Sequence, residues 1–181
     1  YAAISIAVEG QIDTLATQEQ KDSGQAAGKW LKHAMAGPAR DGIYNDSGVE
    51  PITDQWMYHA VADTVLANSL LCSLPEVDAD KVGLMGISWG GVITSTASGI
   101  DDRFACAIPT YGCGHNFSPT NNYGNSLGDD DLYKQAWDPI VRISNATMPV
   151  LWYSWPGEWH FPLDCQAYTY HGAPGERMVS T

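Results

Sequence analysis

Basic residues are scarce in this sequence, and their scarcity narrows the partners that its surface can bind. The 181 residues include 9 lysines and arginines against 21 aspartates and glutamates, which leaves a formal net charge of -12. A surface of this sign repels the phosphates of nucleic acids and the headgroups of anionic lipids. We therefore expect neither a nucleic acid nor a membrane as a partner, and we expect a substrate that is neutral or cationic.

Long apolar runs and paired cysteines are missing as well. No uninterrupted apolar stretch reaches the roughly 20 residues that a membrane-spanning helix needs. The cysteines form no CxxC pair, which argues against a zinc ribbon or a thioredoxin-like site. Cys72 and Cys106 lie in apolar stretches and are expected in the core. Cys113 and Cys165 each follow an expected strand, so a disulfide between them is an alternative to two free thiols.

Clusters of metal ligands are not apparent either. His33, His59 and His115 are scattered, with no carboxylate at ligand spacing. The acidic run 129–131 has two readings, a calcium site or the acidic start of a helix, and we favour the helix. We expect neither a metal ion nor a cofactor.

Short apolar runs alternate with helical patterns along the chain, and the hydrophobic content of 44% is enough for one substantial core. We expect strands at 1–8, 82–87, 104–108 and 149–153 and from Arg177 onward, and helices from Thr53 or Asp54 to Leu71, from Gly90, at about 130–143 and at 163–170. This alternation predicts an α/β fold, a three-layer sandwich in which helices cover both faces of a mostly parallel sheet.

Residues 10–50 differ in kind from the rest. They mix glycine, glutamine, aspartate, serine and proline, with one weak helical patch around 26–36. We treat 1–181 as a single domain in which 10–50 is a long insertion or loop region, and a disordered insertion is the alternative. Because the first residues have the character of the middle of a strand, we expect the fold to be incomplete at both ends.

The most informative motif is Gly86-Ile87-Ser88-Trp89-Gly90-Gly91, which stands between an expected strand and an expected helix. A serine at such a turn is forced into a strained backbone conformation that lifts its hydroxyl above the sheet, and flanking glycines prevent collisions. The N-terminus of the following helix points at the same place, so the Trp89 N–H is expected to stabilise an oxyanion. The pattern predicts that Ser88 is a nucleophile, and the alternative is a glycine turn with an incidental serine.

The stretch from Trp56 to Asp164 resembles the α/β-hydrolase superfamily. More narrowly, it is similar to the branch that contains acetyl xylan esterases and prolyl-oligopeptidase-like hydrolases. The matching motifs are the elbow at 86–91 and the segment Tyr111-Gly112-Cys113-Gly114, with 77–82 and 101–104 in support. In that family the acid of the catalytic triad follows the strand matched here by 150–153, and the histidine follows one further strand.

A serine hydroxyl is a weak nucleophile, so Ser88 requires an imidazole, and the imidazole requires a carboxylate that fixes its tautomer. Glu158 stands at the position that the resemblance assigns to the acid, although the family more often has aspartate there; Asp164 is the alternative. His160 and His171 precede the expected last strand, so we interpret both as ordinary loop residues and place the base outside the given sequence. We also place outside the given sequence the loop that supplies the family's second oxyanion donor.

These residues favour an enzyme. We expect a serine hydrolase that cleaves a carboxylic ester through an acyl-enzyme on Ser88, with an acetyl ester of a carbohydrate as the substrate that the resemblance suggests. Trp155, Trp159, His115 and Asn116 are expected to rim the pocket. The alternatives are a prolyl-oligopeptidase-like peptidase and a non-catalytic binding protein of the same fold. The sequence leaves the oligomeric state open.

Overall fold

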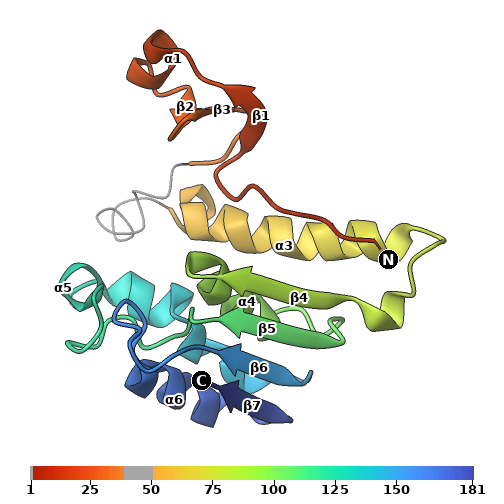
Figure 1. Ribbon diagram of the computed structural model, residues 1–181, viewed down its shortest axis with the longest axis vertical. Helices are drawn as coiled ribbons and strands as arrows, with labels where there is room; N and C mark the ends of the chain where they lie inside the picture. The colour runs from red at the N-terminus through yellow and green to blue at the C-terminus, as the bar shows by residue number, and fades with distance from the viewer. Residues whose placement is uncertain (1, 39–50) are drawn as a thin grey trace.

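The fold is centred on a four-stranded parallel sheet with the order β4-β5-β6-β7. The computed structural model describes residues 2–38 and 51–181, and the strands are β4 (Gly83–Ile87), β5 (Cys106–Thr110), β6 (Val150–Tyr153) and β7 (Arg177–Ser180). All four arrows point the same way in Figure 1. The predicted α/β fold class with a parallel sheet is confirmed, and each strand lies within about two residues of its expected range.

Among the described residues, three longer helices connect or flank these strands, and the short helix α5 (Gly124–Leu127) lies in the loop after β5. The longer helices are α3 (Trp56–Ser73), α4 (Trp89–Ser98) and α6 (Leu163–Gly172). The side chains of Ala107, Val150 and Trp152 point to one face of the sheet and form a core with parts of α3 and α6. A Cβ at Gly86, on the same face of the sheet, would lie 2.7 Å from Thr94 Oγ1 of α4. The three helices therefore share this face, and a helical layer on the other face is not among the elements of the described residues.

A second core lies beyond the carboxyl end of the strands. Trp56 and Met57 of α3 meet Trp89 and Val92 of α4 there, together with Phe161 from the loop after β6. This cluster fastens the loops that follow the strands to the two helices. It therefore packs directly beside the turn between β4 and α4.

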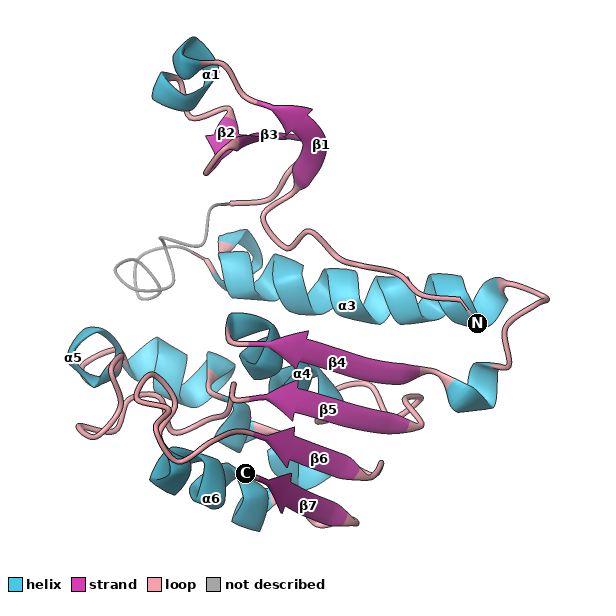
Figure 2. Cartoon of the chain, viewed as in Figure 1, coloured by secondary structure: helices cyan, strands magenta, loops and turns pink. Residues whose placement is uncertain are grey.

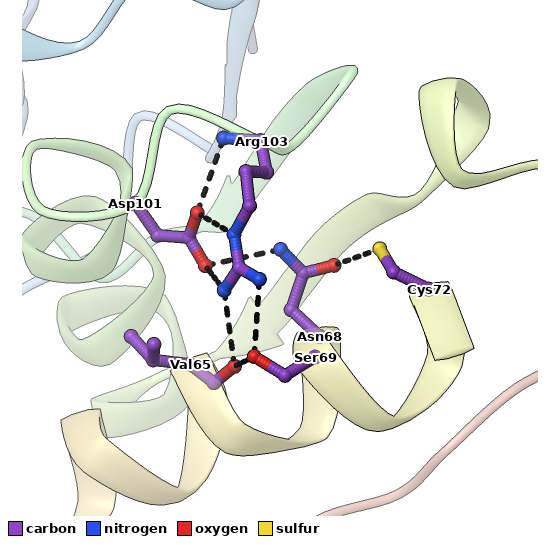
Figure 3. Close-up of polar contacts among 6 residues, drawn as sticks. All are labelled: Val65, Asn68, Ser69, Cys72, Asp101 and Arg103. Carbon is purple, nitrogen blue, oxygen red and sulfur yellow. Dashed lines mark hydrogen bonds and ion pairs between the residues drawn. The ribbon is translucent and has the colours of Figure 1, made fainter.

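An ion pair between the buried Asp101 carboxylate and the partly exposed Arg103, in the turn between α4 and β5, is hydrogen-bonded to α3 (Figure 3). The Asp101 carboxylate accepts hydrogen bonds from Arg103 Nε at 2.7 Å, Arg103 Nη2 at 2.6 Å and Asn68 Nδ2 at 3.0 Å. Arg103 also donates to the Ser69 hydroxyl and the Val65 carbonyl. These contacts hold α3 against the turn that follows α4.

The N-terminal part forms a small sheet of its own, which projects from the top of the molecule in Figure 2. Its strands are β1 (Gln11–Leu15), β2 (Ala26–Ala27) and β3 (Trp30–Lys32), paired antiparallel in the order β1-β3-β2, with the short helix α1 (Gln18–Asp22) between β1 and β2. The insertion predicted at 10–50 therefore carries structure over 11–32, and its part 39–50 lies outside the described residues.

Two expectations for this part are wrong. The stretch 26–36 is not helical, because Gly28 adopts φ +58° and turns the chain tightly between the paired residues Ala27 and Trp30. Residues 2–7 do not form a strand; the chain there runs beside α3 (Figure 1), and Trp56 Nε1 donates to the Val8 carbonyl at 2.8 Å.

The continuous helix expected at 130–143 is broken into short turns. A π-helical turn, Tyr133–Trp137, is followed by single 3-10 turns at Pro139–Val141 and Ile143–Asn145. Pro139 lacks the N–H that a continuing helix requires, and the preceding residue, Asp138, is extended with ψ 131°. Asp138 then caps the next turn, since its side chain accepts from the Ile140 amide.

Candidate active site

Ser88 occupies a sharp turn between the end of β4 and the start of α4. Its backbone adopts φ 58° and ψ -124°, a region that non-glycine residues rarely enter and that costs about 1–3 kcal/mol. Neighbouring backbone stabilises this geometry: the Ser88 amide donates to the Thr110 carbonyl at 3.1 Å, and the Ser88 carbonyl accepts from the Gly91 and Val92 amides. The strained turn that the motif predicted is present.

Two of the three motif glycines are needed for close packing. A Cβ at Gly86 would lie 2.2 Å from the Gly90 carbonyl oxygen, and one at Gly91 would lie 2.8 Å from the Gly112 backbone. A Cβ at Gly90, however, would meet nothing within 4 Å. The expectation that every flanking glycine prevents a collision is therefore wrong for Gly90, which borders open space.

Trp89 is the first residue of α4, so its amide lies at the positive end of the helix dipole. Its indole is buried among aromatic rings, with centroid distances of 6.2 Å to Trp56, 5.3 Å to Tyr123 and 6.2 Å to Phe161. These contacts bring the loops after β5 and β6 against the turn that contains Ser88. Ser88 itself is half-buried, and its hydroxyl makes no hydrogen bond to a residue of the described part of the chain.

Glu158 lies in the loop after β6, and its side chain is 4% exposed. Its Oε1 atom accepts from the His160 amide at 2.7 Å, the Phe161 amide at 3.4 Å and His160 Nδ1 at 3.2 Å. Phe161 packs against Trp89, so this carboxylate is held in a loop that is fixed to the nucleophile turn.

Asp164, the alternative acid, has a different environment. It stands in the first turn of α6, is exposed, and accepts from the Thr120 hydroxyl at 2.8 Å and from the Cys165 amide at 2.9 Å. These contacts tie α6 to the loop after β5. They are the contacts of a residue that stabilises a helix start.

Three histidines lie in α6 and in the loops after β5 and β6. His171 is exposed in the last turn of α6, and His115 stacks on Tyr168 with a centroid distance of 4.3 Å. His160 contacts Glu158, as described above. None of the three hydrogen-bonds the Ser88 hydroxyl.

Aromatic side chains border the loops at the carboxyl edge of the sheet. Trp155 and Trp159 are exposed, and Trp155 packs against Tyr111 at 4.9 Å. Asn116, which we expected at the rim, is instead fully buried and donates to the Cys113 carbonyl and the Tyr133 hydroxyl. The sequence alone suggested no role for Tyr111, although this residue belongs to the motif 111–114 on which the family resemblance depends.

A buried carboxylate that the sequence did not reveal anchors the loop after β5. Asp138 accepts from the amides of His115 at 2.8 Å, Asn116 at 2.9 Å and Ile140 at 3.1 Å. Burial raises the pKa of the Asp138 carboxyl, against the opposite effect of these three donors. The position of Asp138 directly before Pro139 is the feature of the sequence that could have indicated a capping residue.

Cys113 and Cys165 are both buried free thiols, so the disulfide alternative is not formed. Burial raises the pKa of each thiol, which makes both poor nucleophiles. Within residues 2–38 and 51–181, no group of three or more histidine, cysteine, aspartate or glutamate side chains has a metal-binding arrangement. No helix in the same residues is both long and apolar enough to cross a bilayer.

A parallel sheet with a strained serine between strand and helix defines the α/β-hydrolase class. The described residues have this fold, and residues 49–134 match the prolyl oligopeptidase family. No curated protein matches the sequence.

Solved structures share the fold. An acylaminoacyl peptidase from Pyrococcus horikoshii is 22% identical, with a TM-score of 0.59 over 68% of this chain and 23% of its own. An acetyl xylan esterase from Paenibacillus sp. R4 is 19% identical, with a TM-score of 0.62 over 83% of this chain and 54% of its own. Acetyl xylan esterase 1 from Thermoanaerobacterium sp. JW/SL YS485 is 16% identical, with a TM-score of 0.61 over 94% and 65%. The chain thus spans a quarter to two thirds of the length of these proteins.

Proposed function

We propose that the protein is a serine hydrolase in which Ser88 attacks a carboxylic ester and Glu158 is the acid of the triad. The observation that carries this proposal is the strained backbone of Ser88, which is retained between a parallel strand and a helix N-terminus. Strain of this kind persists where the surrounding structure holds it, and it is concentrated at functional sites. The buried carboxylate of Glu158, in a loop packed on the same turn, supports the second assignment.

The reaction follows from the placement of these groups. An imidazole takes the proton of Ser88 Oγ as that oxygen bonds to the ester carbonyl carbon, and the resulting oxyanion accepts a hydrogen bond from the Trp89 amide. The same imidazole then protonates the leaving alcohol, and water releases the acyl group by the reverse sequence. The resemblance places this imidazole after the strand matched by β7, so it is not one of the histidines described above.

An acetyl ester of a carbohydrate is the substrate that we propose. Two of the compared structures are acetyl xylan esterases that share the fold over most of this chain. The exposed rings of Trp155 and Trp159 support this choice, because flat aromatic surfaces stack on sugar rings. The peptidase alternative is supported by the acylaminoacyl peptidase and by the match to the prolyl oligopeptidase family.

A fluorophosphonate probe tests the nucleophile, because it forms a covalent bond only with an activated serine. We expect the natural full-length protein to be labelled at Ser88 and the Ser88→Ala variant to remain unlabelled. Ser144→Ala, which removes an exposed serine away from the turn, is the control and should label normally. A wild-type protein that resists the probe contradicts the proposal, and faster hydrolysis of a proline peptide than of an acetylated xylo-oligosaccharide contradicts the substrate.

A further inference from the structure

The donors around Glu158 are distributed unequally between its two carboxylate oxygens. All three hydrogen bonds, from the His160 amide, His160 Nδ1 and the Phe161 amide, end on Oε1. Oε2 accepts none from the described residues. Oε2 is not a fully buried atom that lacks a hydrogen-bond partner, so it retains some contact with the surface. The carboxylate is thereby fixed through one oxygen while the other stays available.

His160 is suited to hold this arrangement. A carboxylate oxygen only accepts, so the hydrogen of the 3.2 Å contact lies on His160 Nδ1. The imidazole is oriented by its neighbours, since its centroid lies 4.0 Å from that of Trp159 and 6.3 Å from that of Tyr123. Its side chain is 40% exposed, so it is part of the surface around Oε2 rather than of the core.

We infer that His160 is a positioning residue for Glu158: its Nδ1–H holds Oε1 so that Oε2 faces the histidine that serves as base. This inference rests on the proposed function and adds a second imidazole to it, one that acts through the acid and not on the substrate. The three donors hold the same oxygen, and His160 Nδ1 is the one among them that belongs to a side chain, so it is the contact that a substitution can remove.

The test compares two replacements of His160 in the natural full-length protein, with acetyl ester hydrolysis as the assay. His160→Leu removes the donor and keeps comparable volume, and we expect kcat to fall about tenfold, the scale of one hydrogen bond to a charged group, with KM unchanged. His160→Asn places an amide N–H where Nδ1 was, and we expect kcat within about twofold of wild type. His171→Leu, an exposed histidine on α6, is the matched control and should behave as wild type.

A double-mutant cycle separates positioning from a general effect on folding. In a Glu158→Gln background, His160→Leu should cause no further loss, because the group that it positions is already gone. Wild-type kcat in His160→Leu, an equal defect in His160→Asn, or full additivity in the cycle each overturns the inference. If one of these results is found while Ser88→Ala abolishes activity, the positioning role of His160 is wrong and the proposed hydrolase stands. If Ser88→Ala retains activity, both proposals are wrong.

Discussion

Gly112 shows how a residue without a side chain sets the geometry of the turn at Ser88. A Cβ at this position would lie 2.1 Å from the Ser88 carbonyl oxygen and 2.4 Å from the Val92 amide nitrogen. Both of these atoms belong to the backbone that holds Ser88 in its strained conformation. The end of β5 therefore packs directly beneath the turn, and glycine is the residue that permits this approach.

We predict that Gly112→Ala destabilises the protein by at least about 2 kcal/mol, because neither backbone atom has room to withdraw. Labelling of Ser88 by the fluorophosphonate probe should slow in the same variant, since the turn must distort. Thermal unfolding of the full-length protein measures the first effect. Gly90→Ala is the matched change, and it should not destabilise, because its Cβ meets open space within a helix. Equal stability of the two variants contradicts the argument.

Individual residues of the site were predictable to different degrees. The strained turn at Ser88 was predictable because its motif combines a strand, a turn and a helix, and each of these leaves a mark in the sequence; its role as nucleophile stays a proposal. The hydrogen bonds of Glu158 were not predictable, because their donors lie two and three residues further along the same loop and a loop has no hydrophobic periodicity from which its contacts can be inferred. Asn116 was misplaced for a related reason: a polar residue in a loop suggests exposure, but this one satisfies its amide within a buried network.

At the scale of elements, the contact between α3 and the turn after α4 depends on one carboxylate. Burial raises the pKa of the Asp101 carboxyl, but the hydrogen bonds from Arg103 and Asn68 outweigh burial and hold the pKa below its ordinary value. Because the pKa of Asp101 is lower in the folded protein, its ionised carboxylate stabilises the fold at pH values above the unfolded pKa of about 3.9. This contribution is lost as the pH falls through the lowered value.

We predict that Asp101→Asn lowers the free energy of unfolding by about 1–3 kcal/mol at pH 7, a range that allows for the partly exposed Arg103 side chain. The difference from wild type should shrink between pH 7 and an acidic pH below the lowered pKa, where wild-type Asp101 also becomes neutral. Urea unfolding at the two pH values provides the measurement. Asp102→Asn changes the adjacent exposed carboxylate and serves as the control. A difference that is constant over this pH range shows that the ion pair is not its source.

Elements were predicted best where one pattern dominated. The strands of the main sheet are apolar runs bounded by turn residues, and α3 has 18 residues without glycine or proline. The errors fall where two signals compete. At 26–36 a weak helical pattern is overridden by Gly28 in a left-handed conformation. At 130–143 the effect of Pro139 on Asp138 outweighs an apolar spacing that suits a helix.

For the molecule as a whole, the parallel sheet has two unlike faces. Strand alternation and register place Met85, Ile108, Leu151 and Met178 on the face opposite α3, α4 and α6. Met85 is 67% exposed and Met178 is 63% exposed, and the side toward the viewer in Figure 2 carries no helix of the described residues. The alternation of elements predicted the sheet. It did not predict which described helices would share a face, because helices on either face have the same sequence pattern.

An exposed apolar sheet face bounded by two edge strands is a surface that associates with copies of itself. We therefore predict that the polypeptide 1–181, prepared alone at micromolar concentration, forms dimers or larger species despite its net charge of -12. Light scattering coupled to size-exclusion chromatography measures the mass. Met85→Glu combined with Met178→Glu should increase the monomer fraction, because it places charge at both ends of the face.

Added charge alone also raises solubility, so the control variant carries the same charge outside the sheet. Leu66→Glu with Leu70→Glu adds the same charge to two exposed positions of α3, which lie outside the strands of the sheet. If association runs through the sheet, this pair leaves the mass distribution as it was while the methionine pair shifts it toward the monomer. A monodisperse wild-type polypeptide with a cooperative thermal transition, or equal effects of the two pairs, would show that this face is stable in water without a partner.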